Sequence, residues 1–388
     1  MAITLFIVLT KSIAMIIGLL KESHPEQRVA MLPENIKSLV DMNVDIWIED
    51  QAGVSAFISN EKYEEVGAII RSRKEILSEA TIILQINPIS EEELSHLTDH
   101  QVIIGVLNPL REKELVASIK EKNLTSFSLD SIPRTTRAQA MDVLSSMATV
   151  AGYKAVLEAA MQLPTFFPMF MTAAGTIRPA NVLILGAGVA GLQAIATARK
   201  LGAQVSVFDV RAAVKEEVMS LGGKFVDVEG AKEDRSAGGY AVEQTEEYKQ
   251  KQQEAINTHA LKSDVIICTA QIPGRKAPLL ISKEIVEQMK PGSVIIDLAA
   301  STGGNCEVTV DNQMISHHGI NVIGNSNYPS SMPLDASRMF SKNLFNFLKL
   351  IINDKGDLNL DFDDDIVQGT CITHQGEIIN ERVKSQLT

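Results

Sequence analysis

The chain alternates short apolar runs with amphipathic stretches along most of its length. In its N-terminal third the apolar runs predict β-strands at Met15–Leu20, Asp45–Glu49, Ile82–Asn87, Val102–Leu107 and Thr125–Leu129. The stretches between them have the spacing of one-sided helices, at Pro33–Met42, Glu61–Ile70, Glu91–Leu97 and Glu112–Lys122. Continuous apolar strands separated by helices are typical of a parallel sheet that is covered on both faces.

A long predicted helix separates this series from a second one. It runs from about Arg137 to Met161, and Thr136 and Gln139 have the spacing of a capping box at its start. The strands expected after it are Asn181–Leu185, Gln204–Asp209, Lys224–Val228, Asp264–Ala270, Ser293–Leu298 and Ile320–Ile323. Six such strands with intervening helices are what a complete dinucleotide-binding sheet requires.

The chain closes with an apolar helical stretch, Leu334–Ile352, and an acidic tail that contains Asp361–Asp365. We expect the acidic run to be a solvated surface segment and the closing helix to pack back on the first domain. The predicted fold is α/β: two Rossmann-like domains with doubly wound parallel sheets around a central cleft, the first domain being discontinuous. The expected boundaries are 1–144 for the N-terminal domain, 145–330 for the dinucleotide-binding domain and 331–388 for the segment that completes the first.

Composition is that of an ordinary globular protein. The 388 residues are 45% hydrophobic and 22% charged, which suits about two domains with real cores. The net charge of −12 disfavours a nucleic-acid partner, because phosphate binding needs clustered Lys and Arg. Three widely separated cysteines provide neither a disulfide framework nor a thiolate metal cage, and a reducing compartment fits them best.

The N-terminal run Ala2–Leu20 is the one stretch with membrane-like character. Lys11 interrupts it, whereas a spanning helix needs about 20 nearly uninterrupted apolar residues. It also lacks the basic start and the small-residue cleavage site of a signal peptide. We therefore expect a buried first strand from Met15, an upstream extension or mis-set start over Met1–Ala14, and a soluble chain.

The strongest chemical signal is NVLILGAGVAGLQAIATARKLGAQVSVFD, in which Gly186, Gly188 and Gly191 directly follow a predicted strand and open a helix. The first glycine of this motif permits a tight turn, the second lets the backbone approach a pyrophosphate, and the third lets helix and strand pack closely. The helix N-terminus then offers N–H groups and a positive dipole end to the phosphates.

Asp209 ends the next predicted strand, 18 residues after Gly191. A carboxylate at this place accepts hydrogen bonds from the adenosine ribose hydroxyls and repels a 2′-phosphate. Arg211, two residues on, is an NADP-type partner in principle, but Asp209 makes NAD(H) the preferred ligand. The alternative is a glycine-rich turn with a surface aspartate.

A second constellation lies in DSIPRTTRAQAMDVLSS. Arg134 precedes the expected helix start, and Gln139, Asp142 and Ser145 follow at three-residue steps along one side. A guanidinium, an amide, a carboxylate and a hydroxyl placed together can hold a carboxamide and a ribose by hydrogen bonds. The spacing alone leaves an equal alternative, in which Gln139 caps the helix and Arg134 and Asp142 form a surface pair.

SAGGYA combines Gly238 and Gly239 with Tyr240, which suits either a lid over a site or an ordinary surface loop. The seven histidines show no metal-ligand spacing such as HExxH. His317 and His318 are adjacent and would point to opposite faces of an extended chain, so we predict no metal site. No GxSxG elbow or GxxxxGK[ST] phosphate loop is present in the sequence.

From Met15 to its end the chain resembles the proton-translocating NAD(P) transhydrogenase family. The similarity is to the soluble NAD(H)-binding domain I, in the form that is encoded as a separate polypeptide, the first portion of a split alpha subunit. The resemblance rests, in order, on MIIGLLKESHPEQRVAMLPENI, PRTTRAQAMDVLSSMATVAGYKAV, TAAGTIRPANVLILGAGVAGLQAIATA, LGGKFVDVEG, AGGYA, IPGRKAPLLI, KPGSVIIDLAASTGGNCE and IVQGTCITHQGE.

The resemblance identifies Arg134, Gln139 and Asp142 as the family's nicotinamide-positioning loop. It likewise identifies AGGYA as the family's mobile lid, with Tyr240 as its aromatic residue. Further residues that it implies at the NAD site are Val189, Asp209, Val210, Arg211, Gly239, Gln252 and Gln271. Gln271 departs from the apolar residue expected at its position.

For function, the resemblance implies direct hydride transfer between NADH on this chain and NADP⁺ on a partner, coupled to proton translocation. The implied partners are the second, membrane-spanning portion of the split alpha subunit, an NADP(H)-binding beta subunit and a second copy in a homodimer. The chain would then be cytoplasmic and peripheral on the inner face of the plasma membrane through its partners.

Alanine dehydrogenase, a relative in fold, supplies a rival function as a free-standing amino-acid oxidoreductase. Arg28 stands at the position of its substrate arginine. The lysine, histidine and aspartate that its acid–base chemistry needs are absent from LQINP, IGVLNPL and AASTGG, where Gln85, Asn108 and Ser301 stand. A non-catalytic NAD-binding module is the third hypothesis.

Overall fold

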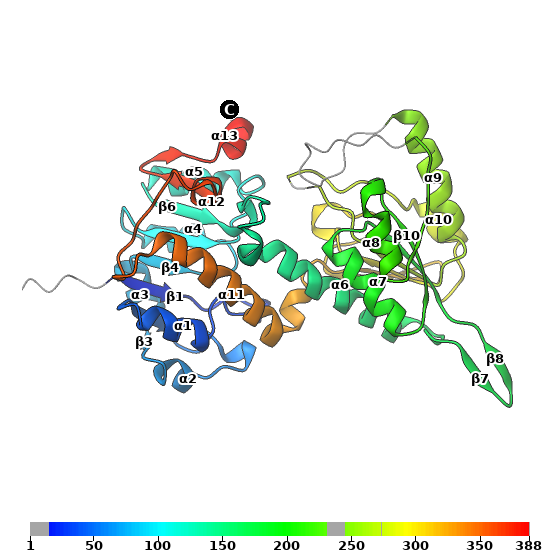
Figure 1. Cartoon of the computed structure of the whole chain (residues 1–388), viewed down its shortest axis with the longest axis horizontal. Helices are drawn as coiled ribbons and strands as arrows, with labels where there is room; N and C mark the ends of the chain where they lie inside the picture. The colour runs from blue at the N-terminus through cyan, green and yellow to red at the C-terminus, as the bar shows by residue number, and fades with distance from the viewer. Residues whose placement is uncertain (1–14, 231–244, 273, 388) are drawn as a thin grey trace, which may run out of the picture. The chain divides into compact units, whose positions relative to one another are not determined.

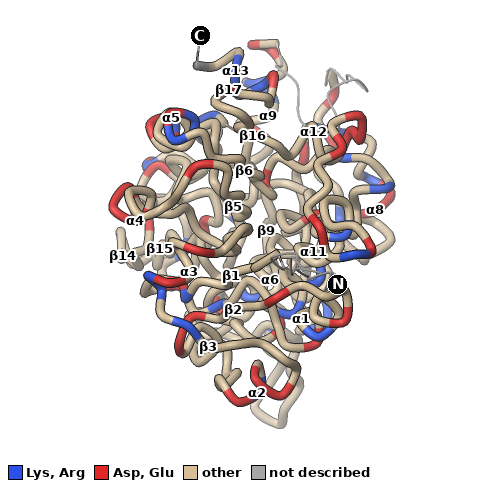
Figure 2. Tube along the Cα trace, turned by 90° about the vertical axis from the view of Figure 1, so that its left-hand side faces the viewer, with Lys and Arg blue, Asp and Glu red and all other residues tan. Residues whose placement is uncertain are grey.

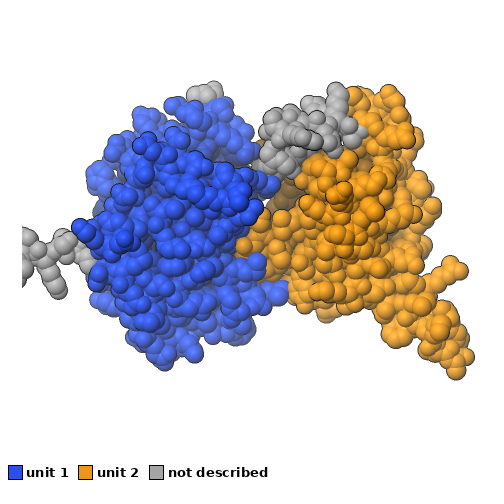
Figure 3. Space-filling model, viewed as in Figure 1, with its two compact units in different colours: residues 1–144, 332–388 blue, residues 145–331 orange. Residues whose placement is uncertain are grey.

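The structure is a computed structural model that describes residues 15–230, 245–272 and 274–387. The chain divides into two compact units (Figure 3), unit 1 with Met1–Leu144 and Met332–Thr388 and unit 2 with Ser145–Ser331. Each unit is built around its own main sheet with helices on both faces (Figure 1). None of the helices within the described residues combines the length and apolar character that crossing a membrane demands.

The main sheet of unit 1 has the order β3-β2-β1-β4-β5-β6 with every neighbouring pair parallel. This is the strand order of a doubly wound Rossmann sheet. Two strands from the far end of the chain extend it, β16 antiparallel to β6 and β17 antiparallel to β16. The bounds are β1 (Ile16–Leu19), β2 (Asp45–Glu49), β3 (Ile69–Arg71), β4 (Ile82–Leu84), β5 (Val102–Gly105), β6 (Thr125–Ser128), β16 (Cys371–His374) and β17 (Glu377–Ile378).

Helices cover both faces of this sheet because its strands are apolar on both sides. Ile83 and Ile103 pack into one core with residues of α3, α4 and α5. On the opposite face Phe127 of β6 meets Phe347 of α11, with ring centroids 5.3 Å apart. The helices of unit 1 are α1 (Pro33–Val40), α2 (Asn60–Glu64), α3 (Arg73–Glu79), α4 (Glu91–Ser95), α5 (Lys113–Glu121), α11 (Pro333–Ile351), α12 (Asp365–Thr370) and α13 (Glu381–Leu387).

Unit 2 repeats this strand order as β11-β10-β9-β12-β13-β15, all parallel, with β14 antiparallel at the edge. The strands are β9 (Asn181–Leu185), β10 (Gln204–Phe208), β11 (Lys224–Phe225), β12 (Val265–Cys268), β13 (Val294–Asp297), β14 (Gln313–His317) and β15 (Ile320–Gly324), with a separate hairpin of β7 (Phe170–Thr172) and β8 (Gly175–Ile177). The helices are α6 (Val143–Gln162), which continues from unit 1, α7 (Val189–Lys200), α8 (Lys215–Ser220), α9 (Glu246–Ala260) and α10 (Lys283–Gln288).

Successive residues of β9 enter different cores, which explains why the strand reads as a continuous apolar run. Val182 and Ile184 pack with residues of α6 and α7. Leu183 and Leu185 pack with residues of α9 and α10. A strand buried on both faces needs apolar residues at every position.

Several short strands differ from the prediction. The helix expected over Glu61–Ile70 is wrong in its second half: α2 ends at Glu64, and Ile69–Arg71 forms β3 beside β2. Gly67 has a φ of +95°, a backbone conformation that breaks the helix. The sequence pattern does not predict β14 or the β7–β8 hairpin, because their residues lack a regular apolar alternation.

Charged residues lie mainly on the helices and loops, with both signs interspersed along the outer trace (Figure 2). The central strands β1, β5 and β9 are largely free of them. This distribution is expected because an unpaired charge is costly to bury.

Replacing Ile372 with alanine tests how much the C-terminal strand contributes to unit 1. Ile372 is 0% exposed and packs with Val116 and Val383, so its truncation should lower the free energy of unfolding by about 2–5 kcal/mol. Ile69→Ala makes the same change at a 40% exposed position of β3 and should cost less than about 1 kcal/mol. Urea unfolding compares the two variants, and equal losses would contradict a C-terminal strand that belongs to the core.

Candidate functional site

The turn between β9 and α7 gives each of its three glycines a different place. Gly186 has a φ of +101°, and a Cβ there would lie 2.5 Å from the Thr269 hydroxyl oxygen. A Cβ on Gly191 would lie 2.0 Å from the carbonyl oxygen of Gly186, whereas a Cβ on Gly188 would meet no atom within 4 Å. The first and third glycines therefore bring helix and strand together, and the second faces open space.

The N-terminus of α7 has room for an anion. Gly188 is its N-cap residue and contributes no side-chain capping hydrogen bond, and Val189 follows at the first helical position, exposed. The first N–H groups of a helix have no partner within the helix and carry its positive dipole end. Such a terminus suits a phosphate group.

Asp209 follows β10 and is 8% exposed. Its Oδ2 accepts a hydrogen bond from the Ala187 N–H at 2.7 Å, which ties it to the glycine turn. Arg211 donates to Oδ1 through its backbone N–H and Nε, both at 2.9 Å, and to Oδ2 through Nη2 at 2.7 Å. The hydrogen bond to Asp209 raises the pKa of Arg211, against the opposing effect of burial.

The sequence does not predict this ion pair. A carboxylate offers about four lone-pair positions, and the four contacts from Ala187 and Arg211 occupy them. Ribose hydroxyls could donate hydrogen bonds to Asp209 only if Arg211 releases at least one of its guanidinium hydrogen bonds to this carboxylate. The NADP-type role considered for Arg211 likewise requires its guanidinium to leave Asp209.

The loops that follow β12 and β13 are joined by a buried amide that the sequence pattern does not reveal. Asn305 donates from Nδ2 to the carbonyls of Ala270 and Pro278, at 2.9 and 2.8 Å, and accepts from the Ala270 N–H at 3.0 Å. Asp297 in turn accepts from the Asn305 N–H at 2.8 Å. Burial raises the pKa of Asp297, and its hydrogen-bond donors act against that rise. Asn305 stands in a Ser-, Thr- and Gly-rich segment of the sequence, so nothing in the local pattern marks it as buried.

The remaining predicted NAD-site residues fall in different places. Gln271 donates from Nε2 to the Leu298 carbonyl at 2.8 Å, so it links the ends of β12 and β13. Gln252 is half-buried in α9, and Val210 packs against the core beside α9. Gly239 and Tyr240 lie outside the described residues.

The polar loop of unit 1 is shaped differently from the prediction. Gln139 opens a 3-10 turn over Gln139–Met141, Asp142 is extended, and α6 begins only at Val143. The expected helix start near Arg137, with a capping box at Thr136 and Gln139, is therefore wrong.

The irregular backbone of this loop is held by hydrogen bonds from α11 to the Ala140 carbonyl. This carbonyl accepts hydrogen bonds from the side-chain amides of Asn343 and Asn346 in α11, at 2.9 and 3.0 Å. Ala138 and Met141 are buried, while Arg134 and Gln139 are exposed and Asp142 and Ser145 are half-buried, Ser145 in the first turn of α6. The loop thus buries its apolar side chains in the core and leaves its polar side chains partly or fully exposed to solvent.

The segment that follows α11 binds the beginning of this loop through Arg137. The guanidinium of Arg137 binds Asp364, with Nη2 to Oδ1 at 2.8 Å, and also Asp365. Asp364 caps α12 by accepting from the N–H groups of Ile366 and Val367, and Arg137 lowers its pKa. A Cβ on Gly369 would lie 2.6 Å from the Pro133 ring. The acidic run lies at the surface as expected, with Asp361, Asp363 and Asp365 exposed, and two of its carboxylates also anchor this loop through Arg137.

The structure also describes the residues that stand at the substrate-binding and acid–base positions of alanine dehydrogenase. Arg28 is buried and donates from Nε and Nη2 to both oxygens of buried Glu26, at 2.8 and 2.7 Å. Gln85 is buried, and Asn108 is exposed with a φ of +49°. The guanidinium of Arg28 is therefore committed to a carboxylate of its own chain.

Comparison with known proteins places this fold in a family. The family model "Alanine dehydrogenase/PNT, N-terminal domain" matches residues 18–151, and "Alanine dehydrogenase/PNT, C-terminal domain" matches residues 155–381. The first portion of the split NAD(P) transhydrogenase alpha subunit of Rhodospirillum rubrum is 44% identical over 380 residues, which are 95% of this chain and 99% of that protein.

Solved structures agree with this assignment. A transhydrogenase from Sinorhizobium meliloti superimposes with a TM-score of 0.85 at 40% identity, covering 94% of this chain and all (100%) of that one. An L-alanine dehydrogenase shares the fold, with a TM-score of 0.80 at 23% identity over 96% of this chain and 100% of its own. The prediction of two Rossmann-like α/β folds is confirmed. The chain therefore belongs to the alanine dehydrogenase/PNT family, and within it to the NAD(P) transhydrogenase alpha subunits.

Proposed function

We propose that this chain binds NAD(H) at the β9–α7 turn of unit 2 and presents it for hydride transfer. The observation that carries the proposal is the junction of the uncapped α7 N-terminus, the open position at Gly188 and the buried carboxylate of Asp209. The helix N–H groups would hold the pyrophosphate. Asp209 would accept the adenosine ribose hydroxyls as Arg211 swings away from it.

The reaction moves a hydride from the nicotinamide of NADH here to that of NADP⁺ on a partner, so that NAD⁺ and NADPH result. The nicotinamides supply this chemistry, and no protein acid or base is needed. Arg134, Gln139 and Asp142 orient the nicotinamide ring through hydrogen bonds, because a fixed near-attack geometry accelerates such a step. Ser145, in the first turn of α6, adds a hydroxyl to this set.

Partner subunits complete the enzyme in this proposal. The similar proteins are named as alpha subunits of NAD(P) transhydrogenase. We infer that an NADP(H)-binding beta subunit receives the hydride and that the membrane-spanning second portion of the alpha subunit couples it to proton translocation. The chain would then sit on the inner face of the plasma membrane through these partners.

We also infer a homodimer. The β7–β8 hairpin extends away from the body of unit 2 (Figure 1) and carries exposed apolar side chains at Met169, Phe170, Met171 and Ile177. A projecting apolar hairpin with unpaired strand edges favours burial against another chain. A monomer in sedimentation analysis at micromolar concentration would exclude this inference.

The rival function of amino-acid oxidation is disfavoured by the Arg28–Glu26 pair. Glu26 already neutralises the buried guanidinium through Nε and Nη2, so a substrate carboxylate bound to the remaining N–H groups would meet a like charge beside it. Gln85, Asn108 and Ser301 offer no group that titrates near neutral pH for acid–base work. Alanine-dependent NADH production by the purified chain would overturn this exclusion.

Cofactor choice can be tested at Asp209. NADH should bind at least about tenfold more tightly than NADPH, because a 2′-phosphate beside this carboxylate is a like-charge contact. Asp209→Asn should narrow the gap, since it removes the repulsion and frees Arg211 to pair with phosphate. Arg211→Ala is the matched control, which keeps the carboxylate and should keep the discrimination. Calorimetry measures both affinities for each protein, and equal binding of NADH and NADPH to the unaltered chain would contradict the proposal.

The nicotinamide loop can be tested by separating binding from transfer. In a mixture with an NADP(H)-binding component, Gln139→Ala or Asp142→Ala should lower the transfer rate at least about tenfold and change NADH affinity by less than about threefold, because the loop orients the ring. Thr136→Ala, an exposed change in the same loop, is the control. If rate and affinity fall together, or neither changes, the loop does not orient the nicotinamide.

A further inference from the structure

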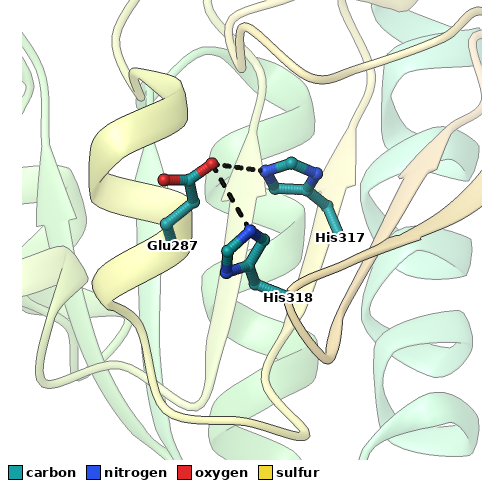
Figure 4. Close-up of side chains that lie close together, drawn as sticks. All are labelled: Glu287, His317 and His318. Atoms are coloured by element: carbon teal, nitrogen blue, oxygen red, sulfur yellow. Dashed lines mark hydrogen bonds and ion pairs between the residues drawn. The ribbon is translucent and has the colours of Figure 1, made fainter.

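Two adjacent histidines and a glutamate of unit 2 converge on one another (Figure 4). Glu287 lies in the last turn of α10, His317 ends β14, and His318 begins the turn that leads to β15. Within the described part of the chain, their three ligand atoms form a group in which all lie within 4.8 Å of one another.

The hairpin turn brings both imidazoles to the same side. His318 and Gly319 have φ values of +50° and +78°, the positive φ pair of a two-residue type I′ turn. The expectation that the two rings point to opposite faces applies to an extended chain, and the backbone is not extended at His318. Instead, the ring centroids of His317 and His318 are 4.8 Å apart, and both rings face Glu287 (Figure 4).

The two distances from the histidines to the glutamate are close to the edges of a tetrahedral metal centre. Nε2 of His317 lies 3.0 Å from Oε1 of Glu287, and Nε2 of His318 lies 3.6 Å from the same oxygen. With bonds of about 2.0–2.2 Å to nitrogen and oxygen, the edges of a tetrahedral zinc site are about 3.4 Å long. An ion can therefore enter with small adjustments of these side chains.

The surrounding backbone holds these residues in place. The Gly292 N–H donates to the Gly319 carbonyl at 2.8 Å, so the hairpin turn is fixed to the chain just after α10. Ile285 and Val286 are buried and anchor α10, whose N-terminus is capped by Ser282. The backbone positions of the three residues are therefore fixed before an ion binds, so the entropy lost on binding is mainly that of their side chains.

We propose that Glu287, His317 and His318 bind a divalent transition-metal ion of the zinc class. Imidazole nitrogen with carboxylate oxygen is a ligand set that suits Zn²⁺, with a water in the fourth position. The ion would link α10 to the β14–β15 hairpin. Lys283 opposes it, because its Nζ lies 3.9 Å from the Glu287 carboxylate.

This site is remote from the proposed nucleotide site along the sheet. β14 and β15 are at the edge of the sheet, separated from β9 by β12 and β13. The His318–Gly319 turn precedes β15, whereas nucleotides bind beyond the carboxyl ends of parallel strands. Metal binding should therefore leave NADH affinity unchanged.

Calorimetric titration of the untagged, chelator-treated full chain with ZnCl₂ at neutral pH tests the proposal. The expected result is one ion per chain. His318→Gln should weaken binding at least about tenfold, since a metal ligand is removed. It leaves the His317–Glu287 hydrogen bond in place, so the fold should remain intact.

Three further variants sharpen the result. Glu287→Gln should weaken Zn²⁺ binding as His318→Gln does, and Lys283→Gln should strengthen it. His100→Gln is the matched control, because His100 is an exposed histidine that also lies beside a carboxylate, 3.2 Å from Asp99. Absence of Zn²⁺ binding at concentrations up to about 100 μM, or binding that His318→Gln leaves unchanged, would overturn the proposal. The cluster would then only pin the hairpin to α10.

Discussion

The proposed nucleotide site of unit 2 depends on how closely α7 approaches the end of β9. A side chain at position 191 would collide with the Gly186 carbonyl at 2.0 Å, and one at position 152 of α6 would collide with the Ala190 carbonyl at 2.1 Å. Because both positions are glycine, the N-terminus of α7 can contact the end of β9 on one side and α6 on the other. That contact sets the α7 N-terminus beside the end of β10, where Asp209 reaches the Ala187 N–H.

A second constraint acts in unit 1, where residues far apart in sequence shape the polar loop. The chain returns after unit 2 to supply α11, α12 and β16, and each contributes to the first unit. The side-chain amides of Asn343 and Asn346 donate hydrogen bonds to the Ala140 carbonyl. Asp364 forms an ion pair with Arg137. These contacts hold Gln139 in a 3-10 turn with its side chain exposed, in place of the regular helix that its sequence spacing favours.

Sequence alone predicts features whose causes are local. The glycine turn, the Asp209 position and most strands follow from patterns within about 25 residues. The Arg137–Asp364 pair joins residues 227 apart, and no pattern announces such a contact. β3 is too short to outweigh the helical spacing before it. The convergence of His317 and His318 depends on a turn with positive φ, and the resting partner of Asp209 depends on a side-chain conformation of Arg211.

Direct hydride transfer from NADH on this chain to NADP⁺ on a partner is the step on which the proposed function depends. It can be measured with NADH that carries deuterium at the transferred C4 position, mixed in ordinary water with the chain, an NADP(H)-binding partner protein and NADP⁺. Mass spectrometry of the product then follows the label. Direct transfer between nicotinamides predicts NADPH that retains the deuterium, because no protein or solvent proton takes part. NADPH without the label, or no NADPH at all, would contradict it.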